Sequence, residues 1–124
     1  MLKLETIHND FRGAIHSITG NELKYPELVI LTAKKDVARG GCIHNKSNEY
    51  FFVIQGKVIY YIGNINKGKR YSTGMGGVIP KKTPHYFIAL EDSIVLEWGA
   101  TPEEKINKHK EFRKMVDDIN DGQK

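Results

Sequence analysis

Up to about residue 99 the chain is a series of short runs rich in β-branched and aromatic residues, separated by Gly, Asn, Asp and Pro. Such runs, bounded by turn residues, are typical of β-strands. Their close spacing favours a sandwich or barrel over alternating strands and helices, so the sequence predicts an all-β fold. The expected strands are Leu2–Ile7, Ala14–Thr19, Leu28–Thr32, Gly41–His44, Glu49–Ile54, Lys57–Ile62, Gly76–Ile79, His85–Ala89 and Ile94–Trp98.

Glycines mark two features of this β-rich region. Gly56 follows Gln55 between two β-branched and aromatic runs, which predicts a hairpin turn. Gly74, Gly76 and Gly77 cluster tightly, which predicts a bulge or a close approach of two backbones.

The pattern changes after the last expected strand. The segment Thr101–Glu104 combines an N-cap Thr, a Pro at the first helical position and a Glu that completes a capping box, so we expect a helix to begin there. Gly122 lies just past its expected end. The helix should cover an exposed edge of the sheet, with recruitment of a partner as the alternative. Its expected apolar face is Ile106, Phe112, Met115, Val116 and Ile119.

The length of 124 residues suits one globular domain. We expect residues 1–100 to form the β-barrel and residues 101–124 to add the helix and tail to the same domain. No apolar run approaches the roughly 18 residues that span a bilayer, and Met1–Glu5 lacks the apolar region of a signal peptide. The expectation is therefore a soluble, cytoplasmic protein with no membrane partner. The single cysteine, Cys42, excludes an internal disulfide.

The formal net charge is +4, from 19 Lys and Arg against 15 Asp and Glu. A modest positive field helps to capture anionic ligands such as sugar nucleotides, although a lysine-rich composition also arises without such a role. No helix-turn-helix, zinc-finger or RNA-binding signature is present, so nucleic acid is not an expected partner.

One Cys, two His and one Glu are spaced so that they can meet. Residues two apart in a strand face the same side, so Cys42 and His44 should point together, and the next strand can bring Glu49 beside them. His85 follows the rigid turn Pro80–Pro84 and can complete the cluster. Two imidazoles and one carboxylate suit iron, zinc, manganese or nickel, and a cysteine ligand would favour zinc. The sequence thus predicts a divalent metal ion bound by Cys42, His44, Glu49 and His85.

These residues resemble the first motif of the cupin superfamily. That motif is similar to His-x-His, three or four residues, Glu, six residues and Gly, and Cys42, His44, Glu49 and Gly56 fall at those spacings. Cys42 stands where the motif has its first His.

The second cupin motif is similar to Gly, five residues, Pro-x-Gly, two residues, His, three residues and Asn. Gly74, Pro80 and His85 fit it, while Lys82 replaces its second Gly and Ala89 its Asn. The resemblance implies a double-stranded β-helix, or jelly-roll, barrel with a C-terminal helix, and a homodimer.

Two further segments, Asn9–Gly13 and Val37–Gly41, resemble the small sugar-nucleotide cupins. These include 3,5-epimerases and 3,4-ketoisomerases of thymidine-diphosphate 4-keto-6-deoxyhexoses, which move a proton beside a ketone without a metal. The base of the ketoisomerases maps onto His44. The resemblance thus implies sugar-nucleotide isomerisation or epimerisation, with a sugar or sugar nucleotide as ligand.

The other roles in such a reaction are assigned to nearby residues. Tyr50 or Tyr86 would supply the assisting acid beside His44. Arg39 and Lys46 would contact the substrate, Arg39 as an anion contact at the pocket mouth.

The chain also resembles small metal-binding cupins found beside polysaccharide-synthesis enzymes, which keep the Glu and the second-motif His. Three functions stay open at this point. They are an isomerase or epimerase that works with a metal or, through His44, without one, a sugar- or metabolite-binding module without turnover, and a metal-dependent dioxygenase, which the two-His, one-carboxylate set suits.

Overall fold

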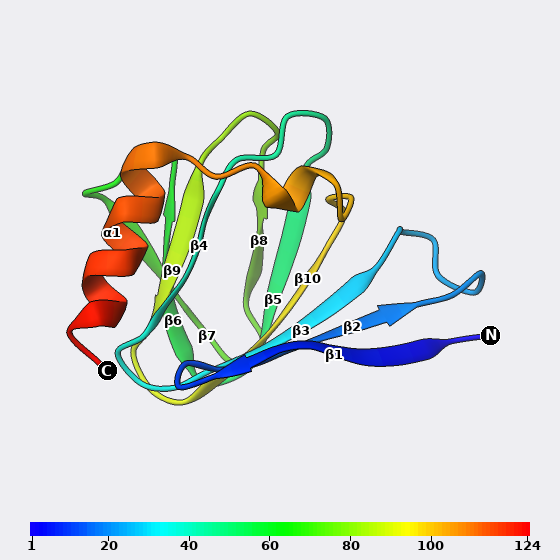
Figure 1. Ribbon diagram of the computed structural model, residues 1–124, viewed down its shortest axis with the longest axis horizontal. Helices are drawn as coiled ribbons and strands as arrows, with labels where there is room; N and C mark the ends of the chain where they lie inside the picture. Colours follow the sequence, from blue (N-terminus) through cyan, green and yellow to red (C-terminus); the bar gives the residue numbers. More distant parts are fainter.

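A computed structural model describes residues 1–124, which form ten β-strands, one 3-10 turn and a C-terminal helix (Figure 1). The elements are β1 (Lys3–Asp10), β2 (Gly13–Thr19), β3 (Leu28–Ala33), β4 (Ala38–Cys42), β5 (Glu49–Gln55), β6 (Lys57–Ile62), β7 (Gly68–Ser72), β8 (Gly76–Ile79), β9 (His85–Ala89), β10 (Ser93–Trp98), η1 (Glu104–Ile106) and α1 (Lys110–Asp121). The predicted mostly-β architecture with a C-terminal helix is confirmed. None of its helices has the length and apolar content that a bilayer crossing needs.

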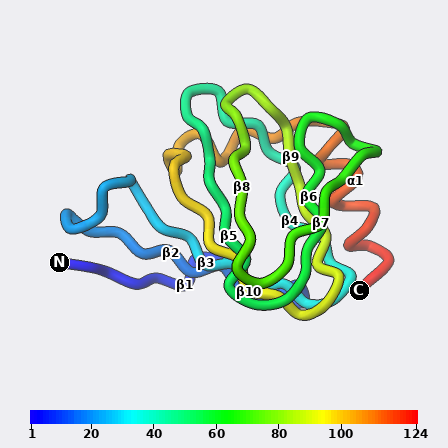
Figure 2. Tube along the Cα trace, turned by 180° about the vertical axis from the view of Figure 1, so that it is seen from behind, coloured from blue at the N-terminus to red at the C-terminus, as the bar shows by residue number.

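The strands form two antiparallel sheets. One has six strands in the order β1-β2-β3-β10-β5-β8, and the other has four in the order β4-β9-β6-β7. In Figure 1 the strands β1 to β3 extend away from the rest of the molecule, and α1 lies on the opposite side. Figure 2, from behind, shows the two chain ends on opposite sides as well.

The core lies between the two sheets because alternate residues of the strands point inward. β5 contributes Phe51 and Val53, β6 contributes Val58 and Tyr60, and β10 contributes Val95, all of them buried. Burial of each such side chain stabilises the fold by about 1.5–3 kcal/mol.

The close approach predicted at the glycine cluster is confirmed. A Cβ atom on Gly76 would lie 2.5 Å from the carbonyl oxygen of Phe51, and one on Gly77 would lie 2.8 Å from the Phe51 ring. The hairpin turn predicted at Gly56 is also confirmed, since this residue joins β5 to β6 with a φ of 100°.

Two expectations about the strands need correction. The sequence prediction missed β7, an edge strand in which Tyr71 alone is buried, so its apolar alternation is weak. The strand expected at Gly41–His44 instead ends at Cys42, which places His44 in the following loop. The reason is a new contact: past β4 the amide of Ile43 donates to the carbonyl of Asn107.

The helix begins at Lys110 and not at Thr101 as expected. Thr101 and Glu104 do form a capping box, with the Thr101 amide 2.9 Å from Oε2 of Glu104, but it closes only the turn that leads into the 3-10 turn η1. The turn ends at Asn107 because this residue is extended and pairs with the chain after β4. Ile106, expected on the apolar face, is 75% exposed.

The helix α1 covers the outer face of the four-stranded sheet. Phe112 and Val116 pack against Ala38 and Tyr86. The side chain of Asn120 accepts a hydrogen bond from the amide of Ala38 at 2.8 Å and donates one to its carbonyl at 2.9 Å. Since Ala38 lies on the edge strand β4, the prediction that the helix covers a sheet edge is confirmed.

The turn before β9 carries a lysine in a left-handed conformation. Lys82 occupies the motif position usually held by Gly, and its φ is 65°. We expect Lys82→Gly to stabilise the protein by about 0.5–1 kcal/mol, because relief of backbone strain exceeds the entropy that glycine adds to the unfolded chain. Urea unfolding measures this change. Lys81→Gly, next to it and without a positive φ, is the control and should destabilise; the same sign for both variants would contradict the argument.

Candidate metal centre and pocket

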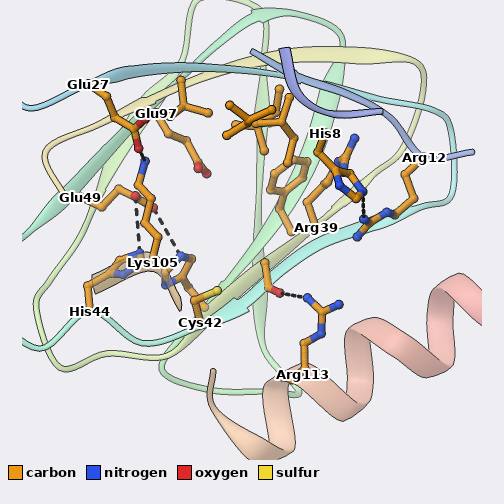
Figure 3. Close-up of a pocket in the computed structure, with 17 residues that line it drawn as sticks. His8, Arg12, Glu27, Arg39, Cys42, His44, Glu49, Glu97, Lys105 and Arg113 are labelled. Atoms are coloured by element: carbon orange, nitrogen blue, oxygen red, sulfur yellow. Dashed lines mark hydrogen bonds and ion pairs between the residues drawn. The ribbon is translucent and has the colours of Figure 1, made fainter. Parts of the chain in front are cut away.

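Three buried ionisable side chains meet between the two sheets: His44, Glu49 and His85 (Figure 3). Their exposed fractions are 3%, 1% and 4%. His44 comes from the loop after β4, Glu49 is the first residue of β5, and His85 is the first residue of β9. One candidate ligand atom from each lies within 4.8 Å of the others. The structure therefore brings together three of the four side chains predicted to bind metal.

Local structure explains why these side chains converge. Glu49 shares the inward face of β5 with Phe51 and Val53. The loop that carries His44 is held at two points. The amide of Lys82 donates to the His44 carbonyl at 2.6 Å, and the carboxylate of Glu104 accepts from the amides of Lys46 and Ser47, both at 2.7 Å.

The distances within this cluster fit ligands around a shared ion. Nε2 of His44 lies 3.5 Å from Oε2 of Glu49, and Nε2 of His85 lies 3.4 Å from Oε1. These separations are long for charge-assisted hydrogen bonds. Two ligands held about 2.1 Å from a tetrahedral ion are themselves about 3.4 Å apart. The cluster is thus spaced as a metal site would require.

The buried polar atoms of the cluster are poorly satisfied by the protein. Nδ1 and Nε2 of His44 and Oε2 of Glu49 have no hydrogen-bond partner among protein groups. Buried polar atoms are normally paired, so each such atom calls for a reason. A divalent cation is one reason that serves both residues, and the residues therefore fit a metal.

Electrostatics favours the ionised form of the carboxylate. Burial acts to raise the pKa of Glu49, but its interactions with His44 and His85 outweigh burial and lower the pKa to about 2. Burial acts to lower the pKa of His44, and the neighbouring Glu49 carboxylate raises it overall. A carboxylate that stays ionised at neutral pH is the form that binds metals.

Cys42, the fourth predicted ligand, lies beside the cluster but outside the group of three. It is half-buried, and in the β4–β9 ladder it stands opposite His85. Burial, followed by the charge of Glu97, raises the pKa of its thiol. A raised pKa favours the neutral thiol over the thiolate that binds metals.

A cavity of about 330 Å³ adjoins the cluster. Its wall is apolar at Val29, Leu31 and Phe87, and Figure 3 shows Arg39 on the side away from His44 and Glu49. Ligand pockets have this mixture of an apolar lining and a few polar groups, and volumes from roughly 300 Å³ upward.

The structure adds an acid that the sequence interpretation missed. Glu97 lines the cavity and accepts a hydrogen bond from the hydroxyl of Tyr60 at 2.9 Å. Burial, and then the negative charge of Glu49, raises the pKa of Glu97 to about 7. The signal was available in the sequence, since Glu97 follows the buried Val95 by two positions and therefore shares its inward face.

The remaining predicted site residues are dispersed. Arg39 lines the cavity, whereas the side chain of Lys46 is exposed and does not. Tyr50 stacks on Trp98 outside the cavity. Tyr86 stacks on Tyr61, and its hydroxyl donates to the carbonyl of Ile65 at 3.2 Å. The structure does not bring either predicted tyrosine to His44.

Comparison of the sequence with protein-family models and with curated proteins finds no match. Solved structures are similar in fold. The capsular polysaccharide assembling protein CapF from Staphylococcus aureus is 19% identical over 88% of this chain, with a TM-score of 0.67. The chain covers 32% of that protein, or about a third of its length.

Two other solved structures agree. KdgF from Halomonas sp. is 18% identical over 84% of this chain and 90% of its own, with a TM-score of 0.60. The cupin domain of Schizosaccharomyces pombe Cnp3 is 12% identical over 73% of this chain and 65% of its own, also with a TM-score of 0.60. At such identities the likeness shows a shared fold.

Proposed function

We propose that this chain, which has the cupin fold, binds a divalent metal ion through His44, Glu49 and His85 and takes a sugar or sugar derivative in the adjoining cavity. The observation that carries the proposal is the buried carboxylate with one imidazole facing each of its oxygens at 3.4–3.5 Å. The donor set suits zinc, iron, manganese or nickel.

The chemistry proposed for this pocket is isomerisation or epimerisation beside a carbonyl group. When bound, a divalent ion polarises a carbonyl oxygen of the ligand. Glu97, with a pKa of about 7, can accept or return a proton at neutral pH, and the Tyr60 hydroxyl holds its carboxylate in place. In this proposal Glu97 takes the proton-transfer role for which the sequence predicted Tyr50 or Tyr86.

The choice of a sugar ligand has two supports. The cavity of about 330 Å³ has the size of a site for one small molecule such as a monosaccharide. Among the proteins of similar fold is CapF, which is described as a capsular polysaccharide assembling protein. A sugar nucleotide would extend beyond the cavity toward solvent.

A binding module without turnover is the second candidate. It is favoured by the positions of Tyr50 and Tyr86, which face away from the cavity. A dioxygenase is the third, since two His and one carboxylate also form the facial triad of iron(II) oxygenases. Oxygen consumption by the iron-loaded protein separates that reaction from isomerisation.

The homodimer stays a prediction, and β1 is the surface that supports it. All eight residues of this edge strand are exposed, among them the apolar Leu4 and Ile7. An exposed edge strand presents unpaired backbone groups that can pair with a second chain.

Elemental analysis by mass spectrometry tests the metal site, on protein purified without a metal-affinity tag. We expect close to one metal ion per chain, and none in the His44→Ala, His85→Ala double variant. His16→Ala removes an imidazole outside the cluster and should keep the metal. Absence of metal after reconstitution with iron, zinc, manganese and nickel in turn would refute the site.

A further inference from the structure

Arg39 is a buried arginine that forms no ion pair with a carboxylate of the protein. Its side chain lines the cavity and is 2% exposed. Its one hydrogen bond runs from Nη2 to the carbonyl of Thr32 at 2.9 Å, and its buried Nε and Nη1 have no partner among protein groups. A guanidinium carries five N–H donors, so most of its capacity is directed at no protein atom.

Asp10, a carboxylate whose charge acts on Arg39, is already engaged in other contacts. Asp10 accepts hydrogen bonds from Nη2 of Arg12 at 2.7 Å and from Nε2 of His8 at 2.8 Å. Figure 3 shows Arg12 and His8 beside Arg39. Burial, and then the positive charge of Arg12, lowers the pKa of Arg39 to about 10. A buried, unpaired charge is costly, and a ligand anion would offset that cost.

We propose that Arg39 binds the carboxylate of a small acidic ligand whose other end reaches the His44, Glu49 and His85 cluster. This inference rests on the proposed function, because it assigns the class of ligand for the same cavity. The planar guanidinium fork matches a carboxylate better than a hydroxyl, and a charge-assisted hydrogen bond in a buried site is stronger than one in water.

The strand register sets the length of such a ligand. In the β4–β9 ladder Arg39 stands opposite Phe87, and His85 lies two residues along β9 from Phe87. Two strand residues span about 7 Å. One sugar ring with its acid group can bridge that distance, and it agrees with the volume of the cavity.

The balance of charge favours a carboxylate over a phosphate. The other cations that line the cavity are each paired with an acidic side chain: Arg12 with Asp10, Lys105 with Glu27 and Arg113 with Asp117. Arg39 is therefore the one lining Lys or Arg without an ion pair. A monoanion neutralises it, whereas a phosphate, with a charge of about −1.5 to −2, leaves excess negative charge near Glu97.

Calorimetric titration of the chelator-treated protein tests the assignment. The probes are D-glucuronate, its neutral analogue D-glucuronamide, and D-glucose 6-phosphate. We expect glucuronate to bind at least about tenfold more tightly than glucuronamide, because the loss of a charge-assisted hydrogen bond is worth about that factor. Glucose 6-phosphate should also bind more weakly than glucuronate, because Arg39 does not neutralise its second negative charge. Arg39→Gln should abolish the preference. Arg70→Gln, which removes an exposed arginine outside the cavity, should retain it.

A second variant is included in case Arg39→Gln does not fold. Arg39→Met keeps much of the side-chain volume and removes the unpaired charge, so its Tm should equal or exceed that of the wild type while the preference for glucuronate is lost. Equal binding of the acid and the amide, tighter binding of the phosphate, or a preference that survives in Arg39→Met would overturn the proposal. Metal is absent from these titrations. They therefore test the role of Arg39 independently of the metal site, which the elemental analysis tests.

Discussion

Glu49→Gln should weaken the binding of a divalent metal ion by at least about 100-fold, the upper end of what loss of a supporting residue costs at a metal site. The reason is geometric, because the two oxygens of this carboxylate face the two imidazoles at 3.5 Å and 3.4 Å. The amide keeps the shape but removes the charge and one oxygen ligand. Competition with a chromophoric chelator measures the affinity.

The same variant has an effect on stability that can be calculated. At a free metal concentration of about 1,000 times Kd, binding adds about 4.1 kcal/mol to the wild type. With a Kd raised about 100-fold, the same concentration adds only about 1.4 kcal/mol. Denaturant unfolding with and without metal measures both values.

Glu97→Gln is the matched control for this experiment. It makes the same chemical change in the same cavity, but Glu97 lies outside the group of three candidate ligands. We expect it to retain metal affinity within about tenfold, the lower limit for loss of a supporting residue. Equal affinities of Glu49→Gln and the wild type would show that the carboxylate is not a ligand.

The strands were predictable because most of them alternate inward apolar and outward residues between turn signals. β3, with Val29, Leu31 and Ala33 buried, and β6, with Val58 and Tyr60 buried, follow this rule closely. β7 does not, since Tyr71 is its one buried residue and its neighbours need no apolar character at an edge. Local pattern therefore predicts strands that build the core better than strands that only extend a sheet.

The start of the helix shows a different limit. The capping box at Thr101 and Glu104 forms as its sequence predicts, yet one turn later Asn107 pairs with Ile43. The two residues lie far apart in the chain, so the local sequence around either one does not predict their contact. His109, whose Nδ1 accepts from the amide of Phe112 at 3.4 Å, then caps the true helix.

Within the site, motif spacing predicted which side chains converge but not which charges remain unpaired. The alternation that turns Glu49 inward also turns Tyr50 outward, so the position of Tyr50 follows from the strand period. The state of Arg39 does not follow in this way. It depends on Asp10, which ends β1 in the other sheet and already pairs with Arg12.

The chelator-treated wild type should lose stability as the pH rises from about 4.5 to 8, and the Glu97→Gln variant should lose less. The pKa of Glu97 is raised from 4.5 to about 7 in the folded state, so the folded protein holds a proton that the unfolded chain releases. Stability then falls with increasing pH across this window. The full shift corresponds to about 3.4 kcal/mol, and because the side chain is only partly buried we expect about 1–2 kcal/mol.

The measurement is the free energy of unfolding at pH 4 and pH 8 for the wild type and the variant. The difference between the two proteins should be small at pH 4 and should favour the variant at pH 8, since the amide oxygen can still accept from Tyr60. Glu91→Gln changes an exposed carboxyl group and should leave the pH dependence as in the wild type. Parallel pH curves for the wild type and Glu97→Gln would mean that Glu97 ionises normally.

The cause of the shift can be tested in the same way. After burial, the negative charge of Glu49 is the next cause of the raised pKa of Glu97. Glu49→Gln should therefore lower the pKa of Glu97. The free energy of unfolding should then depend less on pH through Glu97, so adding Glu97→Gln to Glu49→Gln should change that dependence less than it does in the wild type. A bound cation would act in the same direction by neutralising Glu49, so metal would make Glu97 a stronger acid in the same cavity. The proposed metal site and the proposed acid–base group are then coupled through Glu49.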